Sequence, residues 1–224
     1  MKKSAVVMMM FMVFAAVVNA GEMVPAAVDA GTGVTANTQM AKDDIQKAVE
    51  AYFTSVFGRL KEVADKKPAV DTFRDAMKPL VDKTDGLYGA TFIDTNFIIR
   101  QVYSPSQFLA RGFDLKKVKQ LDYFWEQMRK APEPQVSEPG HGSLVQPRLI
   151  AMRYPVITDG KLQSVVSIMV RTEVFLAAAG LDKCKGYRIT CRGVMAEESG
   201  DLTGKLVSFE SKLPCNDWKV EYKK

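Results

Sequence analysis

The chain has 224 residues and a formal net charge of +5, and 47% of its residues are hydrophobic. This length supports one sizeable core rather than two ordinary domains. The basic residues are spread along the chain instead of gathering in a patch, which argues against a nucleic-acid-binding protein.

The N-terminal residues have the pattern of a secretory signal peptide. Lys2 and Lys3 precede an apolar run from Ala5 to Val18, and Ala20 offers a small residue for cleavage. The run is shorter than the roughly 20 residues that a membrane-spanning helix needs. We therefore predict a signal peptide over residues 1–20, with an uncleaved membrane anchor as the alternative. The mature protein is expected to be periplasmic or secreted and not membrane-spanning.

Residues 21–37 are rich in Ala, Gly and Thr without a sustained period, which predicts a flexible leader. We predict that residues 38–224 form a single domain. At its start, apolar residues recur every three or four positions from Ile45 to Val63, which indicates a long amphipathic helix. Pro68 interrupts the pattern, and a second helical pattern runs from Val70 to Val81.

Two hairpins and a short helix are predicted next. The β-rich runs Leu87–Ile93 and Phe97–Tyr103 surround turn residues and form the first hairpin. The apolar spacing from Leu115 to Met128 indicates a short amphipathic helix. Proline and glycine then forbid regular structure over residues 132–142. The second hairpin is the stretch "RYPVITDGKLQSVVSIMV", residues 153–170.

The end of the chain predicts one more helix and three strands. Thr172 is a helix N-cap and Gly180 can end that helix. The strands are predicted over Tyr187–Met195, Lys205–Phe209 and Trp218–Tyr222. The order of elements predicts an α+β fold, with a largely antiparallel sheet and the long N-terminal helix packed on it.

Three stretches of this chain resemble the extracytoplasmic Cache domains of bacterial sensors, which have a PAS-like fold. They are "FIDTNFII", "DYFW" and "YPVITDGKLQSVVSIMV". The resemblance implies a stand-alone sensor domain that binds a small molecule between its sheet and residues 122–143. A stand-alone domain would signal through a partner, such as a membrane receptor or kinase.

The resemblance also bears on the ligand. In amino-acid-sensing members, the segment matching "DYFW" carries an Arg and the return strand carries an Asp for the ligand amine. Here Asp122 or a neighbour takes the place of the Arg, and Met169 takes the place of the Asp. A buried ammonium would lose its solvation without a charge partner, so we expect a small organic anion or an apolar metabolite instead of a free amino acid.

The two-residue turn Asp159-Gly160 sets a register in which Arg148 lies opposite Arg171. By the resemblance, the ligand face then carries aliphatic, aromatic, hydroxyl and thioether side chains: Ile150, Met152, Tyr154, Ser167 and Met169. The two arginines are either solvated or clamp an anion with bidentate hydrogen bonds. A β-bulge would shift this register and bring Arg153 to the ligand face. Tyr123 and Trp125 lie on the helix that the family places over it.

Cysteine and histidine content limits the chemistry. Cys184, Cys191 and Cys215 predict one disulfide and one free thiol, with Cys215 expected in the bond. The only histidine is His141, and no metal-ligand spacing is present, so we predict no enzyme, no metal and no cofactor. The rival interpretation is a periplasmic interaction or structural protein with the same fold and no functional pocket. Met152, Met169 and Trp125 would then pack together and fill the space.

Overall fold

The computed structural model describes residues 42–103, 111–140 and 147–224. The predicted signal peptide and leader lie outside the described residues, as does His141. Residues Thr38–Lys224 form one compact unit. Among the described residues, no helix combines the length and apolarity that a membrane-crossing helix requires.

Helix α1 (Lys42–Asp65) confirms the long amphipathic helix predicted from the apolar period. Its buried side chains recur every three or four positions and therefore form one face: Ile45, Val49, Phe53, Val56, Leu60 and Val63. Helix α2 (Phe73–Lys83) begins later than predicted, because Val70 lies in the preceding turn and is exposed.

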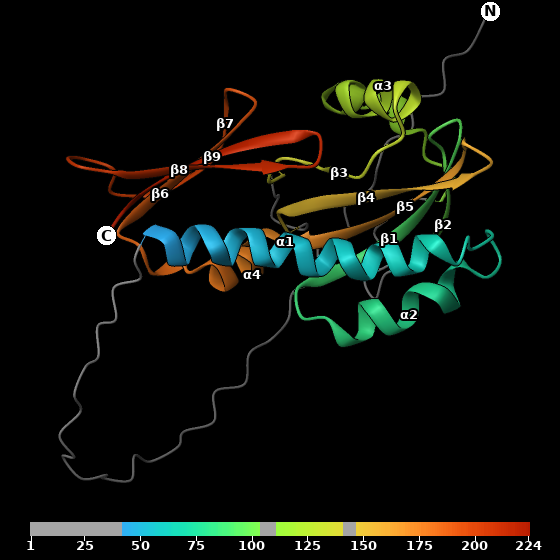
Figure 1. Cartoon of the computed structure of the whole chain (residues 1–224), viewed down its shortest axis with the longest axis horizontal. Coiled ribbons are helices and arrows are strands. Elements are labelled where there is room, and N and C mark those ends of the chain that lie inside the picture. The colour runs from blue at the N-terminus through green and yellow to red at the C-terminus, as the bar shows by residue number, and fades with distance from the viewer. Residues whose placement is uncertain (1–41, 104–110, 141–146) are drawn as a thin grey trace, which may run out of the picture. The chain divides into compact units, whose positions relative to one another are not determined.

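The first sheet has five antiparallel strands in the order β2-β1-β5-β4-β3. The strands are β1 (Leu87–Asp94), β2 (Ile99–Tyr103), β3 (Gln135–Val136), β4 (Leu149–Thr158) and β5 (Lys161–Arg171). Figure 1 shows α1 and α2 along one face of this sheet and α3 (Asp122–Lys130) on the other. Two short 3₁₀ turns, η1 (Leu115–Lys117) and η2 (Lys119–Leu121), take the place of the first half of the helix predicted there.

The second sheet follows helix α4 (Thr172–Ala179) and the 3₁₀ turn η3 (Leu181–Lys183). Its antiparallel order is β7-β6-β9-β8, built from β6 (Gly186–Cys191), β7 (Val194–Gly200), β8 (Val207–Leu213) and β9 (Asn216–Lys223). Trp218 of β9 contacts the rings of Phe53 and Phe175, with centroids 5.2 and 5.6 Å apart. The second sheet therefore shares the core of α1.

One predicted strand is two strands in the structure. Arg192 and Gly193 both have positive φ, 49° and 79°, and turn the chain back between β6 and β7. Such a two-residue turn usually carries Asn-Gly or Asp-Gly. Arg-Gly lacks that signal, so the stretch Tyr187–Met195 gave the pattern of one continuous strand.

The register of the second hairpin follows the prediction only near its turn. Asp159 and Gly160 have φ of 51° and 71°, as a two-residue hairpin turn requires, and Ile157 lies opposite Leu162. A β-bulge at Gln163 then shifts the pairing by one residue, since Val156 lies opposite Ser164.

The bulge changes which side chains share a face. Arg153 lies opposite Ser167, and Leu149 lies opposite Arg171. The predicted pairing of Arg148 with Arg171 is therefore wrong. Arg153 joins the face that carries Ser167 and Val165, as predicted for a bulged hairpin, and Val165 packs with Trp125 of α3.

The predicted disulfide is absent, because Cys184, Cys191 and Cys215 are all free thiols. Cys191 lies opposite Trp218, whereas Cys215 lies in the turn between β8 and β9, with a φ of 57°. Cys184 lies near the opposite end of β6.

Thiol labelling should separate the three cysteines. Burial raises the pKa of the Cys191 thiol strongly, and its side chain is 1% exposed, so this thiol should resist an aromatic disulfide reagent in the native protein. Cys184 and Cys215 are partly exposed and should react first. In denaturant without reductant all of the thiols should titrate, and a missing pair would contradict the free-thiol assignment.

Candidate ligand-binding site

A row of buried polar side chains crosses the first sheet on the face under α3. Register pairs join Gln135 to Arg153, Arg153 to Ser167, and Ser167 to Thr91. Directly opposed residues lie on the same face of a sheet, so the four side chains are neighbours. Each is at most 4% exposed. Because buried polar side chains are normally hydrogen-bonded, the hydrogen-bond partners of this polar row decide whether it could bind a ligand.

Arg153 is the charged member of the polar row. Its guanidinium carbon lies 5.3 Å from the ring centroid of Phe124 and 4.8 Å from that of Trp125. Its Nη1 has no hydrogen-bond partner among the residues that the structure describes. Burial lowers the pKa of Arg153 to about 10, and the charge of Glu138 acts in the opposite direction. Even so lowered, the pKa leaves the guanidinium charged at neutral pH.

The charge of Glu138 acts on Arg153, but the ion pair of its carboxylate is with Arg192, and no salt bridge joins Arg153 to a residue that the structure describes. Arg192 belongs to the turn between β6 and β7 and also lies over the rings of Tyr123 and Phe124, 4.2 and 4.7 Å from their centroids. The second sheet thus holds the N-terminal half of α3 over the polar row.

Gln135 has one satisfied and one unsatisfied amide atom. Its Nε2 donates to the backbone carbonyl of Phe124 at 2.7 Å, and its Oε1 has no partner in the described part of the chain. The neighbouring residue, Val136, is tied to the second sheet by two hydrogen bonds. Its N–H donates to the Pro214 carbonyl at 3.0 Å, and its carbonyl accepts from Asn216 Nδ2 at 3.1 Å.

The thiol of Cys215 lies beside the same amide. Burial and the charge of Glu133 raise the pKa of this thiol, and a hydrogen bond with Gln135 counters part of that rise. The edge of the polar row therefore meets the turn between β8 and β9.

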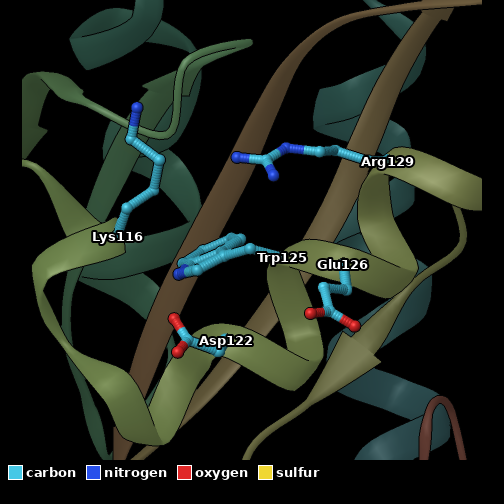
Figure 2. Close-up of a pocket in the computed structure, with 5 residues that line it drawn as sticks. All are labelled: Lys116, Asp122, Trp125, Glu126 and Arg129. Carbon is cyan, nitrogen blue, oxygen red and sulfur yellow. The ribbon is translucent and has the colours of Figure 1, made fainter.

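A pocket of about 150 Å³ opens beside Trp125. Figure 2 shows the indole between two cationic side chains, Lys116 and Arg129, and two carboxylates, Asp122 and Glu126. Trp125 is held in place by stacking on Phe97, with ring centroids 4.7 Å apart and an interplanar angle of 23°. The same indole therefore borders this pocket and contacts the buried Arg153.

The structure brings together only some of the residues predicted to bind a ligand. Arg153, Ser167 and Trp125 meet under α3, and Met169 and Arg171 lie further along the same face of β5. Tyr123 is 41% exposed and faces Arg192.

The remaining predicted residues lie elsewhere. Ile150 and Met152 belong to the core against α1, and Tyr154 packs against that core. Their predicted place on the ligand face is wrong because the bulge shifted the register. Met152 and Trp125 consequently lie in separate clusters and do not fill one space together.

The predicted arginine clamp does not form. The Arg148 guanidinium pairs with the carboxylate of Glu197, and the Arg171 guanidinium lies 3.6 Å from that of Glu173. Sequence reasoning missed Gln135 and Thr91. Gln135 lies in the Pro-rich segment predicted to lack strands, and only its pairing with β4 places it beside Arg153.

The contact between Arg192 and α3 predicts a stability effect. Arg192→Ala should lower the free energy of unfolding by about 1–2 kcal/mol, because it removes cation–π contacts and a partly buried ion pair. Arg188→Ala is the matched control on β6. Its side chain is 37% exposed and pairs with Glu198 and Glu221, so the expected loss is under about 1 kcal/mol. Urea unfolding measures both values, and equal losses would contradict a special role for Arg192.

No protein-family model and no curated protein sequence matches the chain. Solved structures do match its fold. An extracellular ligand-binding receptor from Desulfohalobium retbaense aligns with a TM-score of 0.62 and 13% identity over 81% of this chain. The alignment covers 39% of that receptor's chain.

Two chemoreceptor domains match along most of their own length. The ligand-binding domain of the amino acid chemoreceptor PctC of Pseudomonas aeruginosa, in complex with GABA, aligns with a TM-score of 0.54 and 14% identity over 80% of this chain and 92% of its own. The sensory domain of a Campylobacter jejuni chemoreceptor with isoleucine bound aligns with a TM-score of 0.57 and 11% identity over 81% and 89%. At these identities the matches show a shared fold. The chain has the α+β, PAS-like fold of chemoreceptor sensor domains, as its sequence predicted.

Proposed function

We propose that this chain is an exported sensor domain that binds a small organic anion through Arg153, under helix α3. The observation that carries this proposal is the buried guanidinium of Arg153, which has no ion-pair partner among the described residues. Burying a charge without a partner costs several kcal/mol. A bound carboxylate would supply the missing counter-charge, and guanidinium binds carboxylates with directional, charge-assisted hydrogen bonds.

The same residues favour an anion over the other ligand classes. The chemoreceptor domains of similar fold bind GABA and isoleucine, and each of these ligands carries an ammonium group as well as a carboxylate. The polar row offers an ammonium no carboxylate, because its members are Gln135, Arg153, Ser167 and Thr91. A purely apolar metabolite would leave the charge of Arg153 uncompensated.

Pocket size limits the ligand that could enter beside Trp125. The pocket there has a volume of about 150 Å³. At roughly 30 Å³ per water molecule this equals about five waters. Arg153 does not line this pocket, so a ligand would have to pass Trp125 to reach it, and we propose a small carboxylic acid of two to four carbons.

We propose that this domain signals through a membrane receptor or kinase. This proposal is supported by the fold that the chain shares with receptor sensor domains. The same fold favours a periplasmic location, and it favours a binding role over an enzymatic one. Ligand-loaded and ligand-free protein should capture different amounts of one membrane protein from envelope extracts. Capture of none in either state would contradict the partner.

A thermal-shift series tests the ligand class. Acetate, propionate and succinate are compared with the amines and alcohols of the same chain lengths, on the mature protein at constant ionic strength. Binding to the folded state raises the melting temperature by linkage, so carboxylates alone should raise it, with saturation. Equal shifts with amines or alcohols, or no shift with any carboxylate confirmed by calorimetry, would overturn the proposal.

One observation favours a second candidate, a structural protein without a ligand. Arg153 already occupies the space between Phe124 and Trp125 with its own side chain. An arginine that fills the site permanently would make the protein insensitive to every member of the series above. That outcome would support the structural role.

A further inference from the structure

We infer that Gln135 makes this site selective for a 2-hydroxycarboxylate, a carboxylic acid with a hydroxyl on the adjacent carbon. The inference rests on the proposed binding of an organic anion at Arg153 and adds the group that recognises the rest of the ligand. The carrying observation is a fully buried hydrogen-bond acceptor, Gln135 Oε1, which has no partner in the described part of the chain.

The orientation of the Gln135 amide is fixed by its neighbour. Nε2 donates to the Phe124 carbonyl at 2.7 Å. A carbonyl oxygen can only accept, so the flipped amide would place two acceptors against each other. Oε1 is therefore the free atom, and it requires a donor.

The position of Gln135 sets which ligand atom it meets. Gln135 and Arg153 are register partners on β3 and β4, so their Cβ atoms lie about 5 Å apart on one face. A carboxylate held by Arg153 would carry its adjacent carbon toward one of the two flanking partners, Gln135 or Ser167. The Ser167 hydroxyl can donate or accept a hydrogen bond, so it discriminates little between ligand groups. Gln135 Oε1 accepts only, and it discriminates.

The chemistry at Oε1 separates three related ligands. A hydroxyl donates to Oε1 and remains neutral. An ammonium also donates, but it would be desolvated next to a neutral amide and the Arg153 cation, without a carboxylate in the polar row. A hydrogen in the same place leaves Oε1 buried without a partner, which carries a penalty. The expected order of affinity is hydroxy acid, then unsubstituted acid, then amino acid.

Matched ligands test this order on the unmodified mature protein. Lactate, propionate and alanine share three carbons and differ only at the second carbon, as do glycolate, acetate and glycine with two carbons. Titration calorimetry should give about tenfold tighter binding for each hydroxy acid than for its unsubstituted partner, the size of one satisfied hydrogen bond. The amino acids should bind weakest of the three.

A variant locates the selectivity at Gln135. Gln135→Met keeps the length of the side chain and removes the Oε1 acceptor together with the Nε2 donor to the Phe124 carbonyl, so the lactate-to-propionate ratio should fall to about one. Gln163→Met is the matched control, since Gln163 is exposed at the bulge and should keep the tenfold ratio.

The outcomes distinguish the hydroxyl selectivity of Gln135 from the proposed anion binding at Arg153. Equal binding of lactate and propionate to the unmodified protein would overturn the hydroxyl preference and leave the anion site intact. A ratio that survives in folded Gln135→Met would place the selectivity elsewhere and overturn the role of Gln135. Failure of every carboxylate to bind would remove the anion site and this inference with it. The comparison on unmodified protein does not depend on whether Gln135→Met folds.

Discussion

Arg153→Met is expected to abolish carboxylate binding while leaving the protein as stable as the unmodified chain, or more stable by about 1–2 kcal/mol. Arg153 is 4% exposed, and its guanidinium has no ion pair with a described residue. Its contacts with Phe124 and Trp125 recover part of the desolvation cost, at about 2 kcal/mol for each desolvated cation–π contact. Methionine retains the apolar packing and removes the charge.

The measurement combines urea unfolding with calorimetric titration of a carboxylate. Arg171→Met is the control, because Arg171 lies on the same face of the same sheet but is exposed, with Glu173 and the ring of Tyr88 nearby. It should change stability by less than about 0.5 kcal/mol and keep carboxylate binding. Loss of more than about 2 kcal/mol in Arg153→Met with binding intact would show that Arg153 is a structural residue.

A gain in stability together with a loss of binding would identify a site kept for function. Proteins retain locally unfavourable groups where activity requires them, and removing such groups often stabilises the fold. The neighbouring side chains sharpen the contrast. Thr91 and Ser167 carry buried, neutral hydroxyl groups that could hydrogen-bond to each other. Neither hydroxyl could balance the charge of Arg153.

The fold was predictable because its signals are local. The apolar period of α1, the positive-φ residues Asp159 and Gly160, and the left-handed Gly180 that ends α4 each depend on a few neighbouring residues. Where a local signal was atypical the prediction failed, as at the Arg192-Gly193 turn. The second sheet was predicted as strands but not as a separate sheet, since strand order depends on contacts between distant segments.

The site was less predictable because it depends on register. One unpaired residue, Gln163, moves the β4 side chains from Leu149 to Val156 from one face to the other relative to β5. Nothing in the composition around Gln163 marks a bulge. The sequence could therefore name Arg153 only as the outcome of a bulged alternative. The place of Gln135 in the site could not be predicted, because a two-residue strand in a Pro-rich segment is too short to show an apolar period.

Trp125→Ala is expected to lower the free energy of unfolding by about 3–5 kcal/mol, as for other large aromatic side chains truncated in a core. Trp125 is 2% exposed, stacks on Phe97 and covers Arg153. Trp125→Phe should stay within about 1.5 kcal/mol of the unmodified protein, because it keeps an aromatic ring and removes an indole N–H that has no partner among the described residues. Urea unfolding of the two variants measures the difference. A loss under about 1 kcal/mol in Trp125→Ala would contradict the packing of α3 on the sheet.

The same residue offers a direct optical reading of the site. The chain has two tryptophans, Trp125 beside Arg153 and Trp218 in the core against α1. A carboxylate that binds Arg153 alters the charge over the Trp125 indole, so it should shift or quench the fluorescence of the unmodified protein. In Trp125→Phe only Trp218 emits, and the response should disappear while calorimetry still detects binding. A response that persists in Trp125→Phe would place the bound anion on the α1 side of the sheet and away from Arg153.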